Sequence, residues 1–116
     1  MTAPMVEVSA VVPAAPPVVW ERLAAKFAEL YPPSPHAPKL ELDREGLRLA
    51  AQGGWWYRGE YAVEAHPDGS RVTHRVRNVA KRGRWAVPLA NRLFIGFREQ
   101  TETGFGDLMT AVTRAL

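Results

Sequence analysis

Four polar side chains in two strand-like stretches have the types and the spacing needed to orient a small molecule. Tyr57 and Tyr61 lie in one stretch, and His74 and Asn78 lie in the next. The members of each pair are four residues apart, an even number, so they point to the same side of a strand. Phenol hydroxyls, an imidazole and a carboxamide among apolar side chains are typical polar groups of a ligand site. We therefore predict that these four residues fix the orientation of a bound ligand.

The walls of that site are expected from the same strand faces and from the C-terminal segment. They are apolar or small residues at strand or helix spacing: Trp55, Val63, Val76, Leu93, Phe97, Thr101, Gly104 and Leu108. The arrangement predicts an apolar or aromatic ligand between a sheet and a C-terminal helix. In the alternative interpretation, tyrosine hydroxyls or backbone groups satisfy His74 and Asn78 inside an ordinary core.

His74 is the residue best suited to acid or base catalysis, because an imidazole titrates near neutral pH. The sequence has no Gly-x-Ser-x-Gly motif, and no carboxylate is expected beside His74 on the inward face. We therefore assign no catalytic residue and favour a binding protein over an enzyme. His36, His66 and His74 lack metal-ligand spacing, and no loop has a phosphate-binding pattern, so neither metal nor cofactor is expected.

A tight hairpin would position the four polar residues. Strand-like runs at 55–65 and 71–79 flank Pro67-Asp68-Gly69-Ser70, and Asp-Gly between such runs is typical of a hairpin turn. A two-residue Asp68-Gly69 loop predicts four facing pairs: Ala65 with Val72, Val63 with His74, Tyr61 with Val76 and Gly59 with Asn78. On this register the inward face carries Trp55, Tyr57, Tyr61 and Val63 together with Val72, His74, Val76 and Asn78.

The remaining segments predict a strand, a helix, a second hairpin and a long C-terminal helix. Residues 6–12 alternate as a half-buried strand does, and Pro16 and Pro17 suit the first turn of a helix that ends by Tyr31. Short alternating runs at 39–43 and 46–51 predict the other hairpin. The last helix is expected to begin near Pro88 and to bury one side: Leu93, Phe97, Thr101, Gly104, Leu108, Ala111, Val112 and Ala115.

Composition predicts one domain spanning 1–116. A chain of 116 residues that is 47% hydrophobic can build one core but not two. The absence of cysteine excludes disulfides, and the first residues lack the pattern of a secretory signal, so a cytoplasmic location is expected. No stretch approaches the roughly 20 apolar residues of a membrane span, so none is expected.

The basic balance of the chain does not predict a nucleic-acid partner. The net charge is +3 and the sequence pI is about 9.7, but nucleic-acid binding needs basic residues clustered on one face. Facing acidic residues balance the basic ones on the outer side of the hairpin, with Glu60 across from Arg77: Arg71, Arg75 and Arg77 against Glu60 and Glu64. The unbalanced run at 81–85 is interpreted as a solvated loop.

The segment Ala15-Pro16-Pro17-Val18-Val19-Trp20 after the first strand resembles the START/SRPBCC superfamily of polyketide cyclases and lipid-transfer domains. The run Tyr61 to Val63 followed by Pro-Asp-Gly-Ser is similar to the late hairpin of that family. The resemblance spans nearly the whole chain. It implies a helix-grip α+β fold: a curved antiparallel sheet of about five strands wrapped on a long C-terminal helix, with a short helix after the first strand. It also implies an apolar cavity, although the room between Pro38 and Trp55 is shorter than is common in the family.

Three functions remain open from the sequence. The favoured one is binding of a small hydrophobic or aromatic ligand, lipid-like or polyketide-like, by a monomer or weak homodimer. The second is a polyketide cyclase or dehydratase in which His74 or a tyrosine transfers protons. The third is a pocketless domain that dimerises or docks to a partner through clustered apolar side chains: Trp56, Trp85 and Ile95.

Overall fold

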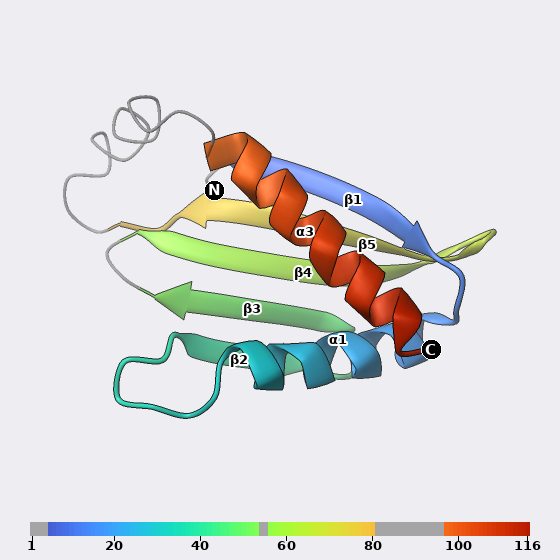
Figure 1. Ribbon diagram of the computed structural model, residues 1–116, viewed down its shortest axis with the longest axis horizontal. Coiled ribbons are helices and arrows are strands. Elements are labelled where there is room, and N and C mark those ends of the chain that lie inside the picture. Colours follow the sequence, from blue (N-terminus) through green and yellow to red (C-terminus); the bar gives the residue numbers. More distant parts are fainter. Residues whose placement is uncertain (1–4, 54–55, 81–96) are drawn as a thin grey trace.

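The computed structural model describes residues 5–53, 56–80 and 97–116, which form an α+β fold (Figure 1). Five strands make one antiparallel sheet in the order β1-β5-β4-β3-β2. The strands are β1 Val6–Val12, β2 Lys39–Asp43, β3 Arg48–Gly53, β4 Tyr57–His66 and β5 Gly69–Asn78, and the described helices are α1 Pro16–Leu30 and α3 Phe97–Arg114. The predicted antiparallel sheet, the helix after the first strand and the C-terminal helix are confirmed.

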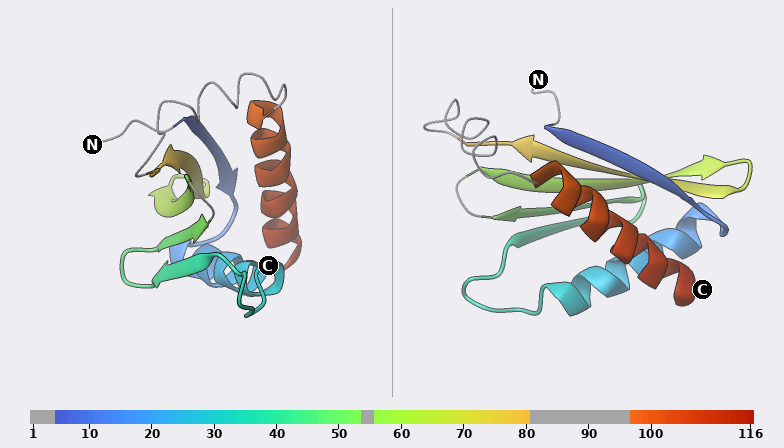
Figure 2. Two further views of the ribbon diagram at one scale, coloured as in Figure 1. Left: turned by 90° about the vertical axis from the view of Figure 1, so that its left-hand side faces the viewer. Right: turned by 45° about the horizontal axis from the view of Figure 1, so that its top comes forward.

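Both described helices lie on one side of the sheet, which we call its inner face (Figure 2). Helix α3 packs over β1, and α1 contacts α3, β4 and β5. The core lies between these layers, and its fully or almost fully buried members include Val12, Trp20, Leu23, Phe27, Leu49, Val63, Val72, Phe105, Met109 and Val112. The opposite side, which we call the outer face, carries the alternate residues of each strand.

Helix α1 follows from a proline start and one apolar stripe. Pro16 and Pro17 occupy its first positions, where a missing N–H costs no intrahelical bond. Its buried side chains recur at helical spacing: Val19, Trp20, Leu23 and Phe27. Trp20 also donates its indole N–H to the carbonyl oxygen of Arg48 over 3.0 Å, which ties the helix to the start of β3. Because prolines follow Tyr31, the helix ends there.

The β2–β3 hairpin is confirmed, with a longer turn than predicted. Leu42 faces Leu49, and β3 begins at Arg48 rather than at Gly46. The turn places Leu47 at a φ of 55°, a left-handed conformation that is uncommon for a side chain other than glycine. This conformation leaves Leu47 packed against the core.

The β4–β5 hairpin has the predicted faces but not the predicted register. Tyr61 pairs with His74 and Val63 pairs with Val72, so the predicted partners Val76 for Tyr61 and His74 for Val63 are wrong, as are the other two predicted pairs. The error is two residues, and an even shift returns every side chain to the same face. His66 pairs with Gly69, so the turn residues are Pro67 and Asp68 instead of Asp68 and Gly69.

Gly69 explains this placement of the turn. Its φ is 132°, and an added Cβ would collide with the carbonyl oxygen of Val12 and lie 2.7 Å from the nitrogen of Ala14. Only glycine combines that backbone angle with so close an approach of another segment. The contact connects the hairpin to the chain between β1 and α1, where Ser70 also donates to the carbonyl oxygen of Ala14 over 2.6 Å.

Replacing Gly69 by alanine is expected to lower the free energy of unfolding by about 2 kcal/mol or more, because the new methyl group meets backbone atoms that cannot move freely. Urea denaturation of the wild-type protein and the variant measures this change in the free energy of unfolding. Gly106→Ala is the matched control, because that glycine is in α3 and has nothing within 4 Å of an added Cβ. The control should gain up to about 1 kcal/mol from helix propensity. Equal effects at the two sites would contradict the argument.

The buried side of α3 agrees with the prediction at Val112 but not at Gly104. Phe105, Met109 and Val112 are buried, whereas Gly104 is exposed and an added Cβ there would meet nothing within 4 Å. Phe105, Met109 and Val112 are four and three residues apart and so lie on one side of the helix. Gly104 is about 100° away from Phe105 around the helix axis. The assignment of Gly104 to the wall of the site is therefore wrong. The predicted start near Pro88 lies outside the described residues.

Within the part of the chain that the structure describes, neither helix is both long enough and apolar enough to cross a membrane.

Candidate functional site

The inner face of β4 and β5 places Tyr61 and His74 in direct contact. They are cross-strand partners, and their rings stack with centroids 4.2 Å apart and planes 12° apart. Phe105 of α3 lies nearly parallel to both rings, with its centroid 6.0 Å from that of His74 and 6.5 Å from that of Tyr61. The three rings therefore join the sheet to the helix. The sequence-based prediction missed Phe105, because it placed Gly104 on this side instead.

His74 is buried and hydrogen-bonded through one ring nitrogen. Its Nδ1 lies 3.1 Å from the carbonyl oxygen of Glu60, which can only accept, so Nδ1 carries a proton. Burial lowers the pKa of His74, and this effect is larger than that of the hydrogen bond to Glu60, which raises the pKa. The neutral ring then presents Nε2 as an acceptor. His74 is thus equipped to accept a hydrogen bond rather than to carry a charge.

The lowered pKa of His74 predicts a pH-dependent stability. The unfolded chain takes up a proton at higher pH than the folded chain, so the free energy of unfolding is greatest above the unfolded pKa of about 6.5 and falls as the pH drops from there towards the folded pKa. The slope for one proton is at most about 1.4 kcal/mol per pH unit. Denaturation curves between pH 7.5 and about pH 5 measure it.

His74→Phe, which keeps a stacked ring without a titrating group, should reduce that slope. His36→Gln is the control, because His36 is exposed in the loop after α1. If the two variants and the wild-type protein shared one slope, His74 would not be the source of the pH dependence.

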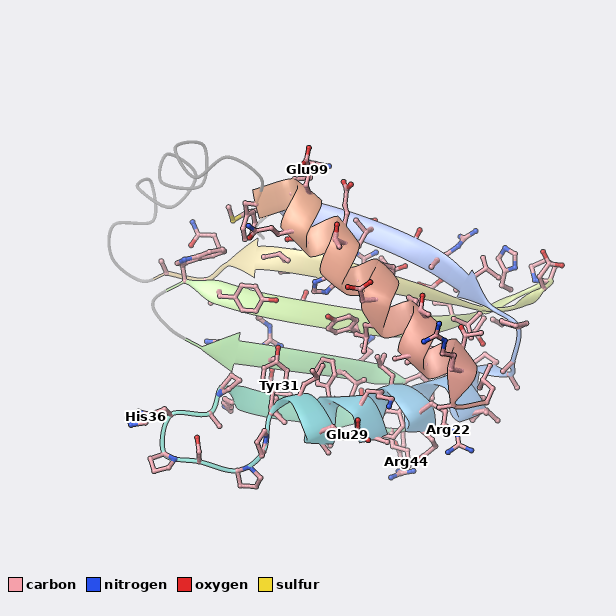
Figure 3. All side chains as sticks on the ribbon, viewed as in Figure 1. Arg22, Glu29, Tyr31, His36, Arg44 and Glu99 are labelled. Atoms are coloured by element: carbon pink, nitrogen blue, oxygen red, sulfur yellow. The ribbon has the colours of Figure 1, made fainter. Side chains whose placement is uncertain are left out.

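Three tyrosines reach the same region from two elements. Tyr31 is at the C-terminal end of α1 and points from the helix towards the sheet (Figure 3), and Tyr57 and Tyr61 are on the inner face of β4. The Phe27 ring is in T-shaped contact with both Tyr31 and Tyr61, with centroids 5.7 Å and 5.0 Å away. We call Tyr31, Tyr57, Tyr61, His74 and Phe105 the inner aromatic cluster.

The phenols of Tyr57 and Tyr61 stay protonated, and the three hydroxyls of this cluster lack hydrogen-bond partners in the described part of the chain. Burial, and then the neighbouring phenols of Tyr57 and Tyr31, raise the pKa of Tyr61 far above its usual range. Burial and Tyr31 raise the pKa of Tyr57 in the same way. Among the described residues, none forms a hydrogen bond with any of the three hydroxyls. Each tyrosine is half-buried, so the hydroxyls are polar groups in an apolar setting that a ligand can still reach.

Gly59 makes room for this arrangement. An added Cβ would lie 2.6 Å from the hydroxyl oxygen of Tyr57 and 3.2 Å from Cε1 of His74. The phenol of Tyr57 therefore extends over the bare backbone of Gly59, which the ring of His74 also approaches. A glycine inside a strand marks such a close approach, so the sequence contained a signal for this residue that the prediction did not use.

Asn78 has a structural role in the described residues. It is 4% exposed, and its side-chain oxygen accepts a hydrogen bond from the backbone N–H of Ala80 over 3.0 Å. This contact supports the alternative that its carboxamide is satisfied inside the protein. Thr101 is similar, because its hydroxyl donates to the carbonyl oxygen of Phe97 over 2.9 Å. Neither residue offers the free donor that Tyr57 or Tyr61 does.

The predicted wall residues fall into three groups. Val63 and Val76 are buried on the inner face, while Phe97, Thr101 and Leu108 are half-buried on α3. Gly104 is on the exposed side of that helix, and Trp55 and Leu93 lie outside the described residues.

Trp56, the predicted docking residue, is half-buried. Its ring lies 5.6 Å from that of Tyr57 and 5.7 Å from that of Phe97. Trp56 therefore does not provide the isolated, exposed indole that the docking hypothesis expects. Its other two residues, Trp85 and Ile95, lie outside the described residues.

Among the described residues, no group of three or more His, Cys, Asp or Glu side chains is arranged to hold a metal ion. No carboxylate of this part of the chain pairs with His74. The arrangement at the inner aromatic cluster therefore consists of stacking surfaces, phenol donors and one imidazole acceptor, which are groups that bind and orient.

No protein-family model matches the chain, and no curated protein matches its sequence. Among solved structures, the chain is similar to the crystal structure of TTHA0849 from Thermus thermophilus, with a TM-score of 0.65 and 19% sequence identity. The likeness covers 95% of this chain and 97% of that one. A match at this TM-score over nearly the full length of both chains shows a common fold.

Proposed function

We propose that the protein is a helix-grip module of the START/SRPBCC type that binds a small, neutral aromatic or apolar molecule at the inner aromatic cluster. A five-stranded antiparallel sheet with a C-terminal helix on its inner face is the architecture that this proposal needs. The observation that carries it is the group of three half-buried tyrosines, whose hydroxyls have no hydrogen-bond partner among the described residues. Buried polar groups are otherwise paired, so a ligand oxygen would complete the site.

The chemistry of the cluster favours a neutral ligand over an anion. The hydroxyls of Tyr57 and Tyr61 can donate to a carbonyl or hydroxyl oxygen, and Nε2 of neutral His74 can accept from a hydroxyl group. No cationic side chain belongs to the cluster, and transfer of a carboxylate into such a setting is costly without a paired charge. The stacked rings of Tyr61, His74 and Phe105 add flat apolar surface that suits an aromatic ring.

The deciding experiment combines native mass spectrometry of the purified protein with a titration by 2-naphthol, a neutral aromatic alcohol. A retained small molecule that 2-naphthol displaces, or saturable binding of 2-naphthol in isothermal titration calorimetry, would support the proposal. A protein without adduct that leaves 2-naphthol unbound up to its solubility limit would overturn it. The same spectra report the mass of the assembly and so test the dimerisation alternative.

A further inference from the structure

The outer face of the sheet has a charged groove of about 320 Å³, on the side that no described helix covers (Figure 2). The groove crosses β2 to β5 and is lined by four arginines and three acidic residues. Ala50 and Ala62 also line it, and their short side chains leave the hollow between the longer ones. Its charged lining residues lie on the opposite face of the sheet from the side chains of the inner aromatic cluster, so it is a separate candidate site.

Two of the three carboxylates in the groove are already neutralised by arginines. Arg58 forms ion pairs with both Glu41 and Glu60, and Glu60 also binds Arg77. The hydrogen bonds from Arg58 and Arg77 hold the pKa of Glu60 below its usual value, against the effect of burial. These residues therefore form a fixed wall of the groove.

The third carboxylate, that of Asp43, forms no ion pair with a described residue. Oδ1 of Asp43 accepts a hydrogen bond from the backbone N–H of Gly46 over 2.9 Å, which holds the side chain within its own turn. Arg48 is the cross-strand partner of Asp43, yet it forms no ion pair with any described residue. One guanidinium group in the groove thus lacks a counter-charge from the described part of the chain.

Arg75 approaches the same hollow from the other side. Its Nε donates to Glu7 over 3.2 Å, and this contact leaves the two terminal nitrogens for another partner. Arg48 on β3 is opposite Ala62 of β4, and Arg75 on β5 is opposite Glu60 of β4, so the two arginines are offset along the strands and their backbones are about 12 Å apart. Two long side chains can span that distance over β4, beside the carboxylate of Glu60, which Arg58 and Arg77 already neutralise. The indole of Trp20 holds the backbone of Arg48 in place.

We propose that this groove binds the phosphate group of a small organic molecule, held between the guanidinium groups of Arg48 and Arg75. A tetrahedral phosphate presents oxygens to both sides at once, whereas the two oxygens of a carboxylate suit one bidentate arginine. The groove is larger than a phosphate ion, so the rest of the molecule would lie over Ala50 and towards β2. The net charge of +3 also favours an anionic ligand.

Titration of the ¹⁵N-labelled protein with inorganic phosphate, at constant ionic strength set with chloride, tests the proposal. Saturable amide shifts are expected in β3 to β5, and Arg48→Gln and Arg75→Gln should each weaken phosphate binding about tenfold. Arg48→Lys, which keeps the charge but loses the bidentate geometry, should fall in between. Arg71→Gln is the matched control, because Arg71 is on the outer face of β5 and does not line the groove.

Two results would overturn the proposal: shifts that do not saturate, or a loss at Arg71→Gln as large as at Arg48→Gln. Acetate in place of phosphate should bind clearly more weakly, and phenyl phosphate more tightly. Equal binding of acetate would refute the preference for phosphate, and equal binding of phenyl phosphate would refute the organic ligand. Preserved peak dispersion in each variant shows that a lost affinity is not a lost fold.

Discussion

Replacing both Tyr57 and Tyr61 by phenylalanine is expected to weaken binding of 2-naphthol by about thirtyfold, without destabilising the fold. Each hydroxyl contributes about 1 kcal/mol when it donates to a ligand oxygen, and two such bonds account for that factor. In the free protein the same hydroxyls are desolvated and unpaired among the described residues, as the raised pKa values of both phenols reflect. Removing them should therefore leave the free energy of unfolding unchanged or slightly higher.

Naphthalene provides the control on the ligand side, because it has the same rings without an oxygen. The wild-type protein and the double variant should bind naphthalene equally. Isothermal titration calorimetry gives both affinities, and urea denaturation gives the stability. An equal loss of affinity for the two ligands would mean that the substitutions altered packing rather than hydrogen bonding. A loss of stability of about 1 kcal/mol or more would show that the hydroxyls already have partners in the free protein.

The faces of the hairpin could be predicted from sequence because they depend only on alternation. Tyr57, Tyr61 and His74 share the inner face whichever even register the strands adopt. The register itself could not be predicted, because Pro67-Asp68-Gly69-Ser70 permits more than one tight turn. The choice depends on Gly69, whose backbone meets Val12 and Ala14 from a distant part of the chain. That contact is tertiary and has no local signature.

The missed members of the inner aromatic cluster have similar explanations. Phe105 lies between two glycines, and a one-position error in the helix face exchanged it for Gly104. Tyr31 was predicted only as the end of a helix, and its place near Tyr61, with the Phe27 ring in contact with both, depends on how α1 packs on the sheet. The charges on the outer face of the hairpin were predicted to balance, and the groove there is lined by four arginines and three acidic residues, which is close to balance. Among the described residues, Arg48 stays unpaired because the turn after β2 holds Asp43.

Replacing Trp20 by alanine is expected to lower the free energy of unfolding by about 4 kcal/mol, a large part of the stability of a domain of this size. The side chain is 2% exposed in the centre of the core, so its removal leaves a large cavity. It also leaves the carbonyl oxygen of Arg48 without its indole donor. Denaturant unfolding monitored by circular dichroism measures the change.

Two further variants separate the contributions of Trp20. Trp20→Phe keeps most of the packing and loses the hydrogen bond to the Arg48 carbonyl, so it should cost about 1–3 kcal/mol. Arg44→Gln removes the guanidinium that lies 4.9 Å from the indole ring and that pairs with Glu21, but both charges are exposed, so the loss should stay below about 1 kcal/mol. If Trp20→Phe were as costly as Trp20→Ala, the indole hydrogen bond rather than core packing would be what holds α1 against β3.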